Sequence, residues 1–310
     1  MYSGLLRINA RNAVYVCDYI NVRNDENDCL IGNNMRRKRM KKIVYLAIAL
    51  ILIGSIAGCG NRGGNTDPTV LNIGASASPH AEILEFVKPM MEERGITMNI
   101  TVFNDFVQPN VALHEGDIDA NYFQHVPYLD SFNEARGWTL TPVGAVHYEP
   151  LGIYPGRTTS LDELQDGAQI AIPNDPTNGA RALLLLEYNG LITLDPTAGI
   201  AATVRDITDN PMNLTITEME AAQIPRALQD VDLAVINGNF AMQAGMNVKD
   251  DALAFEDPDS PAAQTYKNVI VVRYGEEDNK AVRILLEVLH SEEVRNFIDE
   301  TYRGAVVPIF

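Results

Sequence analysis

Residues 70–90 read VLNIGASASPHAEILEFVKPM, a strand pattern followed at once by a helix pattern. Val70 to Ser76 is predominantly small and aliphatic, which is typical of a buried strand. Ser78 is suited to the N-cap of a helix and Pro79 to its first position. One apolar face is then formed by Ile83, Phe86, Val87 and Met90. This stretch predicts a β-strand leading directly into an amphipathic α-helix.

The same alternation continues along the chain. Further strands are predicted at 97–103, 117–121, 140–146, 152–154, 169–172, 214–218, 232–236 and 268–272. Helices are predicted at 109–115, 176–188, 280–289 and 292–302. Strands that alternate with helices indicate βαβ units and parallel sheets. The predicted fold class is therefore α/β.

A weak internal repeat points to two similar halves. Residues 112–121 (ALHEGDIDAN) recur in outline as 227–235 (ALQDVDLAV), and each copy has the pattern of a helix end, a tight turn and a short strand. Asn121 and Asn237 are expected close to the ends of the two strands. Because ligands of open parallel sheets bind outside the carboxyl ends of the strands, the repeat favours a cleft between two domains.

The charge distribution excludes several classes of partner. Of the 24 Lys/Arg and 41 Asp/Glu, nine and four precede Cys59, which leaves 15 and 37 after it, a net of −22. Such an acidic body repels nucleic acid. No cysteine follows Cys59, and no Cys/His spacing is typical of a zinc site. We expect no metal, no cofactor and no nucleic-acid partner.

The N-terminal region has the pattern of a targeting segment. Met40-Lys41-Lys42 is a basic start, and the uncharged run 43–57 is shorter than the roughly 20 residues of a membrane span. It ends in Ile56-Ala57-Gly58-Cys59, which resembles the lipobox of bacterial lipoproteins. We expect 1–39 to be a non-native extension with the true start at Met40 or Met35. We further expect 40–58 to be a signal peptide and 59–69 to be a lipidated Cys59 with a flexible tether.

Several segments resemble the methionine-binding lipoprotein family (NlpA family). They occur in the family's order as 103–110 (FNDFVQPN), 116–129 (GDIDANYFQHVPYL) and 172–178 (IPNDPTN), supported by 160–164, 223–226 and 234–237. The resemblance implies a two-lobed type II periplasmic-binding-protein fold with the ligand in the cleft between the lobes. The lobes are expected at 70–147 plus 242–310, and at 148–241. It further implies an extracytoplasmic lipoprotein, attached to the membrane by its anchor, that supplies methionine to an ABC permease and ATPase.

Three polar residues are candidates for the two charged ends of an amino acid. Arg181 lies in the predicted helix 176–188, and its guanidinium matches a carboxylate bidentately. A surface arginine is the alternative, although Leu183 to Leu186 make the helix largely buried. Asn178 and Asn237 can donate and accept, so either can meet the ammonium or the carboxylate. First-turn capping for Asn178 and a turn role for Asn237 remain the alternatives; the resemblance favours the ligand.

The aromatic residues Phe106, Phe123 and Tyr128, with His125 among them, are candidates for the side-chain pocket. A thioether packs favourably on aromatic rings, and the resemblance implies that these positions contact the methionine side chain. An ordinary hydrophobic core is the alternative. Phe106 departs from the family, which often has Tyr there, and the missing hydroxyl makes the pocket more apolar.

The leading hypothesis is a binding protein for L-methionine. The alternatives are the same role with D-methionine, a methionine-containing dipeptide or another amino acid, or a surface adhesin built on the same scaffold. No GxSxG, SxxK or HExxH motif indicates an enzyme. His80, His114, His147 and His290 are isolated in the sequence, and we expect structural or surface roles for them.

Overall fold

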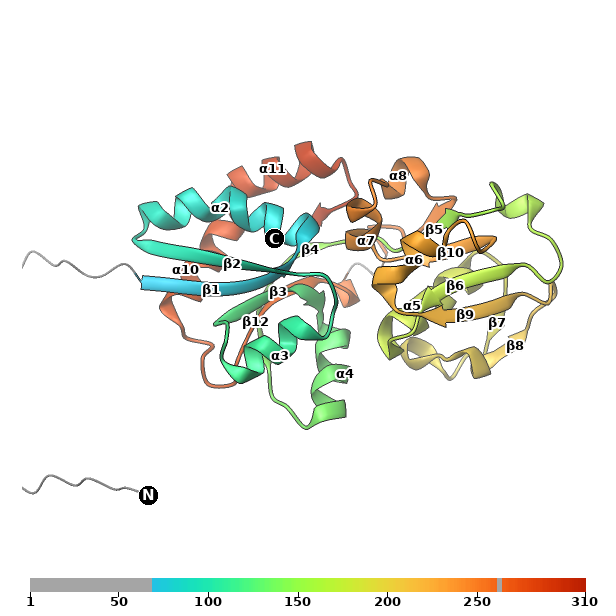
Figure 1. Ribbon diagram of the computed structural model, residues 1–310, viewed down its shortest axis with the longest axis horizontal. Coiled ribbons are helices and arrows are strands. Elements are labelled where there is room, and N and C mark those ends of the chain that lie inside the picture. Colours follow the sequence, from blue (N-terminus) through green and yellow to red (C-terminus); the bar gives the residue numbers. More distant parts are fainter. Residues whose placement is uncertain (1–68, 261–263) are drawn as a thin grey trace, which may run out of the picture. The chain divides into compact units, whose positions relative to one another are not determined.

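The computed structural model describes residues 69–260 and 264–310 (Figure 1). The expectations for the extension, the signal peptide, Cys59 and the tether up to residue 68 lie outside these residues. Among the helices of the described part, none is long and apolar enough to cross a membrane.

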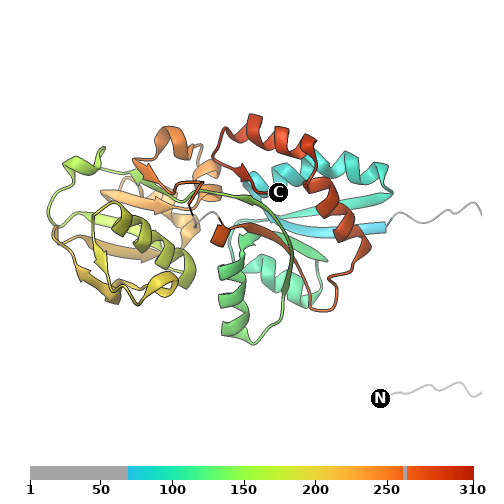
Figure 2. The same ribbon diagram turned by 180° about the vertical axis from the view of Figure 1, so that it is seen from behind.

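The first lobe is built on a six-stranded sheet in the order β13-β4-β12-β3-β1-β2. Its strands are β1 (Thr69–Ser76), β2 (Ile96–Phe103), β3 (Ala120–His125), β4 (Thr141–Tyr148), β12 (Asn268–Val272) and β13 (Val307–Pro308). Its helices are η1 (Ala77–Ala81), α2 (Glu82–Glu93), α3 (Gln108–Glu115), α4 (Val126–Arg136), α10 (Lys280–Leu289) and α11 (Glu292–Tyr302). Helices α2, α10 and α11 pack together on one face, whereas α3 and α4 lie against the other (Figures 1 and 2).

The second lobe is built on a five-stranded sheet in the order β11-β5-β10-β6-β9. Its strands are β5 (Gly152–Pro155), β6 (Gln169–Pro173), β9 (Thr215–Met219), β10 (Leu233–Ile236) and β11 (Ala254–Phe255), with a separate pair β7 (Thr193–Leu194) and β8 (Ile207–Asp209). Its helical segments are η2 (Leu161–Glu163), α5 (Pro176–Tyr188), η3 (Gly199–Ala201), η4 (Val204–Asp206), η5 (Ala221–Gln223), α6 (Ile224–Ala227), α7 (Gly238–Gln243) and α8 (Val248–Asp251).

Burial explains why these segments become strands and helices. All residues of β10 (LAVI) and β12 (NVIVV) are buried, as expected for central strands covered on both faces. Helix α10 instead buries one stripe, formed by Ala281, Val282, Leu285, Val288 and Leu289. Each fully buried aliphatic side chain contributes roughly 1.5–3 kcal/mol, so the two lobes are held mainly by their cores.

The sheets are mixed, which corrects the expectation of parallel sheets. In the first lobe β1 is parallel to β2 and β3, but β12 runs antiparallel to both β3 and β4. In the second lobe β6 is parallel to β10 and β9, whereas β5 and β11 are antiparallel. The antiparallel strands belong to the segments where the chain passes from one lobe to the other.

The crossings also move one lobe boundary. Residues 149–151 join β4 of the first sheet to β5 of the second, and Glu256 follows β11. Glu256 N donates to Leu151 O (3.0 Å), so the two crossing segments are hydrogen-bonded. Because β11 pairs with β5, residues 254–255 belong to the second sheet and not to the first lobe, where the expected boundary at 242 placed them.

Candidate functional site

A small cavity lies where the two lobes meet. Its lining comes from the loop after β2, the ends of β3 and β10, the first two turns of α5, the starts of α4, α7 and β12, and the crossing after β4. The residues are Phe106, Phe123, Gln124, His125, Tyr128, Glu149, Asn178, Arg181, Asn237, Gly238, Asn239 and Asn268. All seven residues predicted from the sequence are among them.

One wall of the cavity is aromatic. The ring of Phe106 lies 6.0 Å from Phe123, 5.7 Å from Tyr128 and 4.8 Å from Phe240, measured between centroids. The Tyr128 hydroxyl donates to the backbone O of Phe106 (2.9 Å), which fixes the loop that carries this ring. Helix α4, which the sequence patterns did not predict, begins directly after His125 and thereby places Tyr128 beside Phe123.

His125, Asn178 and Asn237 form one hydrogen-bonded chain. Tyr128 N donates to His125 Nδ1 (3.1 Å), so the proton is on Nε2, which donates to Asn178 Oδ1 (3.1 Å). Asn237 Nδ2 donates to the same oxygen (2.8 Å). Burial, and then Arg181, lowers the pKa of His125 to about 3, which keeps the ring neutral. This chain links the first lobe to the second.

Asn178 forms several hydrogen bonds within the protein. Its Nδ2 donates to both carboxylate oxygens of Asp175 (3.0 Å each), and its backbone N donates to Asp175 Oδ1 (2.9 Å). Asp175 is the N-cap of α5, so the capping interpretation of Asn178 describes these contacts well. Asn178 therefore holds His125 and Asn237 in place.

Two side-chain atoms at the cavity remain without partners in the described part of the chain. Asn237 Oδ1 and Asn239 Nδ2 are buried and form no hydrogen bond. Leaving a buried polar atom unpaired costs roughly 1–3 kcal/mol. An acceptor and a donor of this kind are the groups that an ammonium and a carboxylate would satisfy.

Arg181 is buried, and most of its guanidinium faces another residue of the chain. Nε and Nη2 donate to Glu256 (2.8 and 2.5 Å), and Nη2 also donates to the backbone O of Glu149 (2.8 Å). The guanidinium carbon lies 4.4 Å from the Tyr266 ring. Burial opposes ionisation of Glu256, but the guanidinium outweighs it and holds the pKa of that carboxyl below its usual value. Only Nη1 takes no part in these bonds, so a bidentate grip on a ligand would require Glu256 to move.

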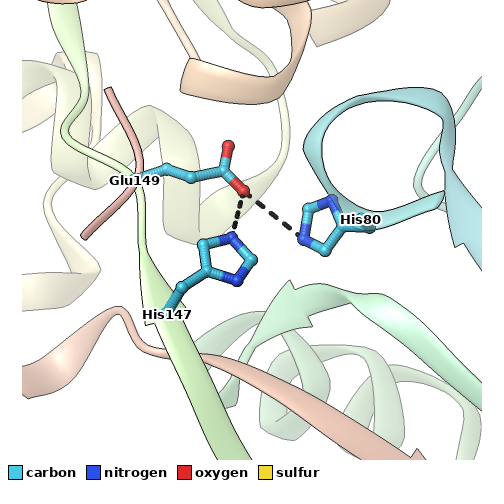
Figure 3. Close-up of side chains that lie close together, drawn as sticks. All are labelled: His80, His147 and Glu149. Carbon is cyan, nitrogen blue, oxygen red and sulfur yellow. Dashed lines mark hydrogen bonds and ion pairs between the residues drawn. The ribbon is translucent and has the colours of Figure 1, made fainter. Parts of the chain in front are cut away.

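The charged group that the sequence did not reveal is Glu149. Its Oε1 is 2.7 Å from His147 Nε2 and 3.4 Å from His80 Nε2 (Figure 3). Burial raises the pKa of Glu149. A Cβ at position 238 would lie 3.0 Å from Oε2, so Gly238 lets the carboxylate approach the start of α7. His147 and Glu149 are two residues apart at the end of β4, a spacing that puts both on one face and was the available signal.

His80 and His147 are isolated in the sequence but lie together in space at Glu149, because β1, which leads into η1, belongs to the same sheet as β4. The expectation of surface or structural roles holds for His114, which is exposed and stacked on Trp138. The three ligand-type atoms of His80, His147 and Glu149 lie within 4.8 Å of one another, as in a metal site. His147 Nε2 is, however, within hydrogen-bonding distance of the carboxylate, whereas His80 Nε2 bonds to Asn268 Oδ1 and lies 3.4 Å from Glu149.

The internal repeat locates one site residue and misplaces another. Asn237 follows β10 and lines the cavity, as expected. Asn121 lies inside β3, where it donates to Pro109 O (3.1 Å) and Asn110 Oδ1 (2.8 Å). Gln124, Asn239 and Asn268 also line the cavity; the sequence analysis did not single out Asn239 or Asn268.

Comparisons with known proteins place the chain in a family. Residues 71–310 match the family described as NlpA lipoprotein. The methionine-binding lipoprotein MetQ of Bacillus subtilis is 40% identical over 275 residues, which cover 87% of this chain and 99% of that protein. The D-methionine-binding lipoprotein MetQ of Escherichia coli K12 is 41% identical over 261 residues, covering 83% and 94%.

Solved structures agree with the fold. A lipoprotein from Ruminococcus gnavus has a TM-score of 0.77 and 51% identity, covering 78% of this chain and all of that one. A nutrient binding protein from Burkholderia cenocepacia, solved bound to methionine, has a TM-score of 0.74 and 43% identity, covering 77% and 100%. The two-lobed fold is that of these binding proteins, and the chain belongs to the NlpA lipoprotein family.

Proposed function

We propose that the protein binds L-methionine in the cavity between its lobes and delivers it to the permease and ATPase of an ABC importer. The observation that carries this proposal is one cavity with an aromatic wall and a buried carboxylate. The rings of Phe106, Phe123 and Tyr128 suit a polarizable thioether. Two relatives are named as binders of methionine or D-methionine, which supports the same ligand here.

The polar groups suggest how the zwitterion lies. Glu149 supplies a negative charge for the ammonium, and Asn237 Oδ1 supplies a second acceptor. Asn239 Nδ2 and Arg181 Nη1 supply donors for the carboxylate. The ligand's carboxylate and ammonium then supply the hydrogen-bond partners that these buried atoms lack, and its thioether extends toward the rings.

Calorimetric titration tests the ligand. The protein is first unfolded and refolded to remove bound ligand, and then titrated with L-methionine, D-methionine and L-leucine. We expect one L-methionine per chain, bound about 2- to 10-fold more tightly than leucine because the sulfur gains contacts with the rings. Tighter binding of D-methionine would assign the other stereoisomer. Absence of heat with every amino acid would contradict the proposal.

The second part of the proposal concerns attachment. We expect Cys59 to be acylated and to be the first residue of the mature protein, because a short apolar run and a lipobox precede it. Mass spectrometry of protein extracted from membranes with detergent should find the acylated Cys59 peptide. A Cys59→Ser variant should appear in the soluble fraction or keep its leader. An unmodified Cys59 within an intact chain would contradict the anchor.

A further inference from the structure

The side chains around Glu149 form a closed cluster at the back of the cavity. His80 comes from η1, His147 from β4 and Tyr122 from β3, and all three are buried. His80 and His147 lie side by side, with ring centroids 4.9 Å apart, and Figure 3 shows both rings turned toward the carboxylate. Two segments far apart in the sequence, η1 and β4, therefore meet at one oxygen atom, Glu149 Oε1, and Tyr122 reaches it through His147.

The contacts determine where the protons lie. Nε2 of His80 faces only acceptors, Asn268 Oδ1 (3.0 Å) and Glu149 Oε1 (3.4 Å), so it carries hydrogen. Nε2 of His147 lies 2.7 Å from Glu149 Oε1 and donates to it when Glu149 is ionised. The Nδ1 atoms then accept from the hydroxyls of Ser76 (2.6 Å) and Tyr122. Both rings are thus neutral donors, and the network is complete when Glu149 is ionised.

The ionised cluster has a charge of −1 and no cation of its own. Arg181, the nearest cationic side chain in contact with residue 149, reaches its backbone O, while its Nε and Nη2 bind Glu256. A buried carboxylate without a counter-charge is costly unless a cation arrives. Glu149 lines the ligand cavity, so a bound ammonium is in a position to supply that charge.

We propose that His80 and His147 are positioning residues that hold Glu149 as a fixed, ionised acceptor, so that the cavity admits only ligands with a free primary ammonium. This inference rests on the proposed function and adds the feature that the ligand must have. N-acylated amino acids present no such ammonium and are rejected. His80 also orients Asn268, which lines the same cavity.

The cluster gives binding a pH dependence of defined sign. Burial raises the pKa of Glu149, opposed by His80, Arg181 and the backbone N–H of Asn239. The other titratable groups that face the cluster are His147, Tyr122 and Tyr302. As the pH falls through the raised pKa, the carboxylate gains a proton and loses its charge, whereas the α-amino group of a free amino acid is already cationic and stays so. Affinity for an ammonium ligand therefore falls with acidification.

Two ligands that differ only in the amino group test the inference. L-methionine and 4-(methylsulfanyl)butanoic acid share the carboxylate and the thioether. At pH 7.5 the unsubstituted protein should prefer methionine by about 30-fold or more. Between pH 7.5 and 5 the affinity for methionine should fall and that for the desamino acid should not. Parallel pH profiles, or equal affinities at pH 7.5, would overturn the inference.

Matched variants separate positioning from mere structural support. In His147→Gln the amide can still donate toward Glu149, whereas His147→Phe fills the space without a donor. We expect His147→Phe to reduce the preference for methionine by about 10- to 100-fold and His147→Gln to restore most of it. His114→Phe, at an exposed histidine, is the control. Equal loss of both ligands in His147→Phe would indicate a structural role only and contradict the inference.

A protein that binds neither ligand at pH 7.5 contradicts the proposed function itself. Methionine binding without discrimination contradicts only the positioning role. If His147→Phe does not fold, the pH profiles of the unsubstituted protein with the two ligands still decide, because they need no variant.

Discussion

Replacing Arg181 with alanine is expected to lower the free energy of unfolding by about 3–5 kcal/mol, because it leaves Glu256 buried without its partner. Glu256 has a side chain that is 9% exposed and accepts two bonds from the guanidinium. Tyr148 and Leu151 N also donate to it, so the carboxylate cannot turn away without breaking further contacts. Denaturant unfolding monitored by circular dichroism measures the change.

The same substitution should weaken methionine binding by about 30-fold to several thousand-fold if Nη1 donates to the ligand carboxylate. A double variant separates the two effects. Arg181→Met with Glu256→Gln removes both charges, so stability should largely return, while binding should remain poor. Arg94→Ala, at an exposed arginine, should change the unfolding free energy by less than about 0.5 kcal/mol. Recovery of both stability and affinity in the double variant would remove Arg181 from the ligand site.

Helices with clear end signals were predicted from the sequence with matching bounds. Helix α5 begins at Pro176 after the Asp175 cap, and α11 begins at Glu292 after the Ser291 cap. Such signals are local, so the sequence alone reveals them. Helix α4 was missed because Phe123 to Tyr128 was interpreted as a pocket segment, although His125 is its N-cap and Gly137 its end.

The sequence predicted those site residues that lie in or next to the segments resembling the family. The aromatic wall and Asn237 line the cavity as expected. The partner of Arg181 was not foreseen because Glu256 is 75 residues away and reaches the guanidinium only through the pairing of β11 with β5. Sequence patterns carry no information on which of the many acidic residues a folded chain brings to one cation.

The cluster at Glu149 was missed for the same reason. His80 precedes His147 by 67 residues, and their contact depends on the crossing after β4. A lone histidine in a sequence is most often structural, and this interpretation is right for His80 and for His147 when each is taken by itself. The function inferred for the pair arises only from the distances to one carboxylate oxygen.

The buried histidines should make the ligand-free protein unstable in mild acid. His80, His125 and His147 are 1%, 6% and 0% exposed. Desolvation lowers their pKa values to about 4, 3 and 3, respectively. In the unfolded chain each ring takes up a proton near pH 6.5, whereas the folded chain does not. Stability is therefore fully present above pH 6.5 and is lost progressively as the pH falls toward 4.

Glu149 acts in the opposite direction, because its raised pKa lets the folded state take up a proton before the unfolded state does. Three histidines against one carboxyl leave a net loss of stability as the pH falls from 6.5 to 5. Urea unfolding at pH 7.5, 6.5, 5.8 and 5 measures it. His125→Gln should reduce the slope between pH 6 and 5 by about 1.4 kcal/mol per pH unit, whatever its effect at neutral pH, while His114→Gln serves as the control. An unfolding free energy that stays constant from pH 7 to 5 would show that these rings titrate alike in both states, and the neutral hydrogen-bonded arrangement around His125 and Glu149 would then be wrong.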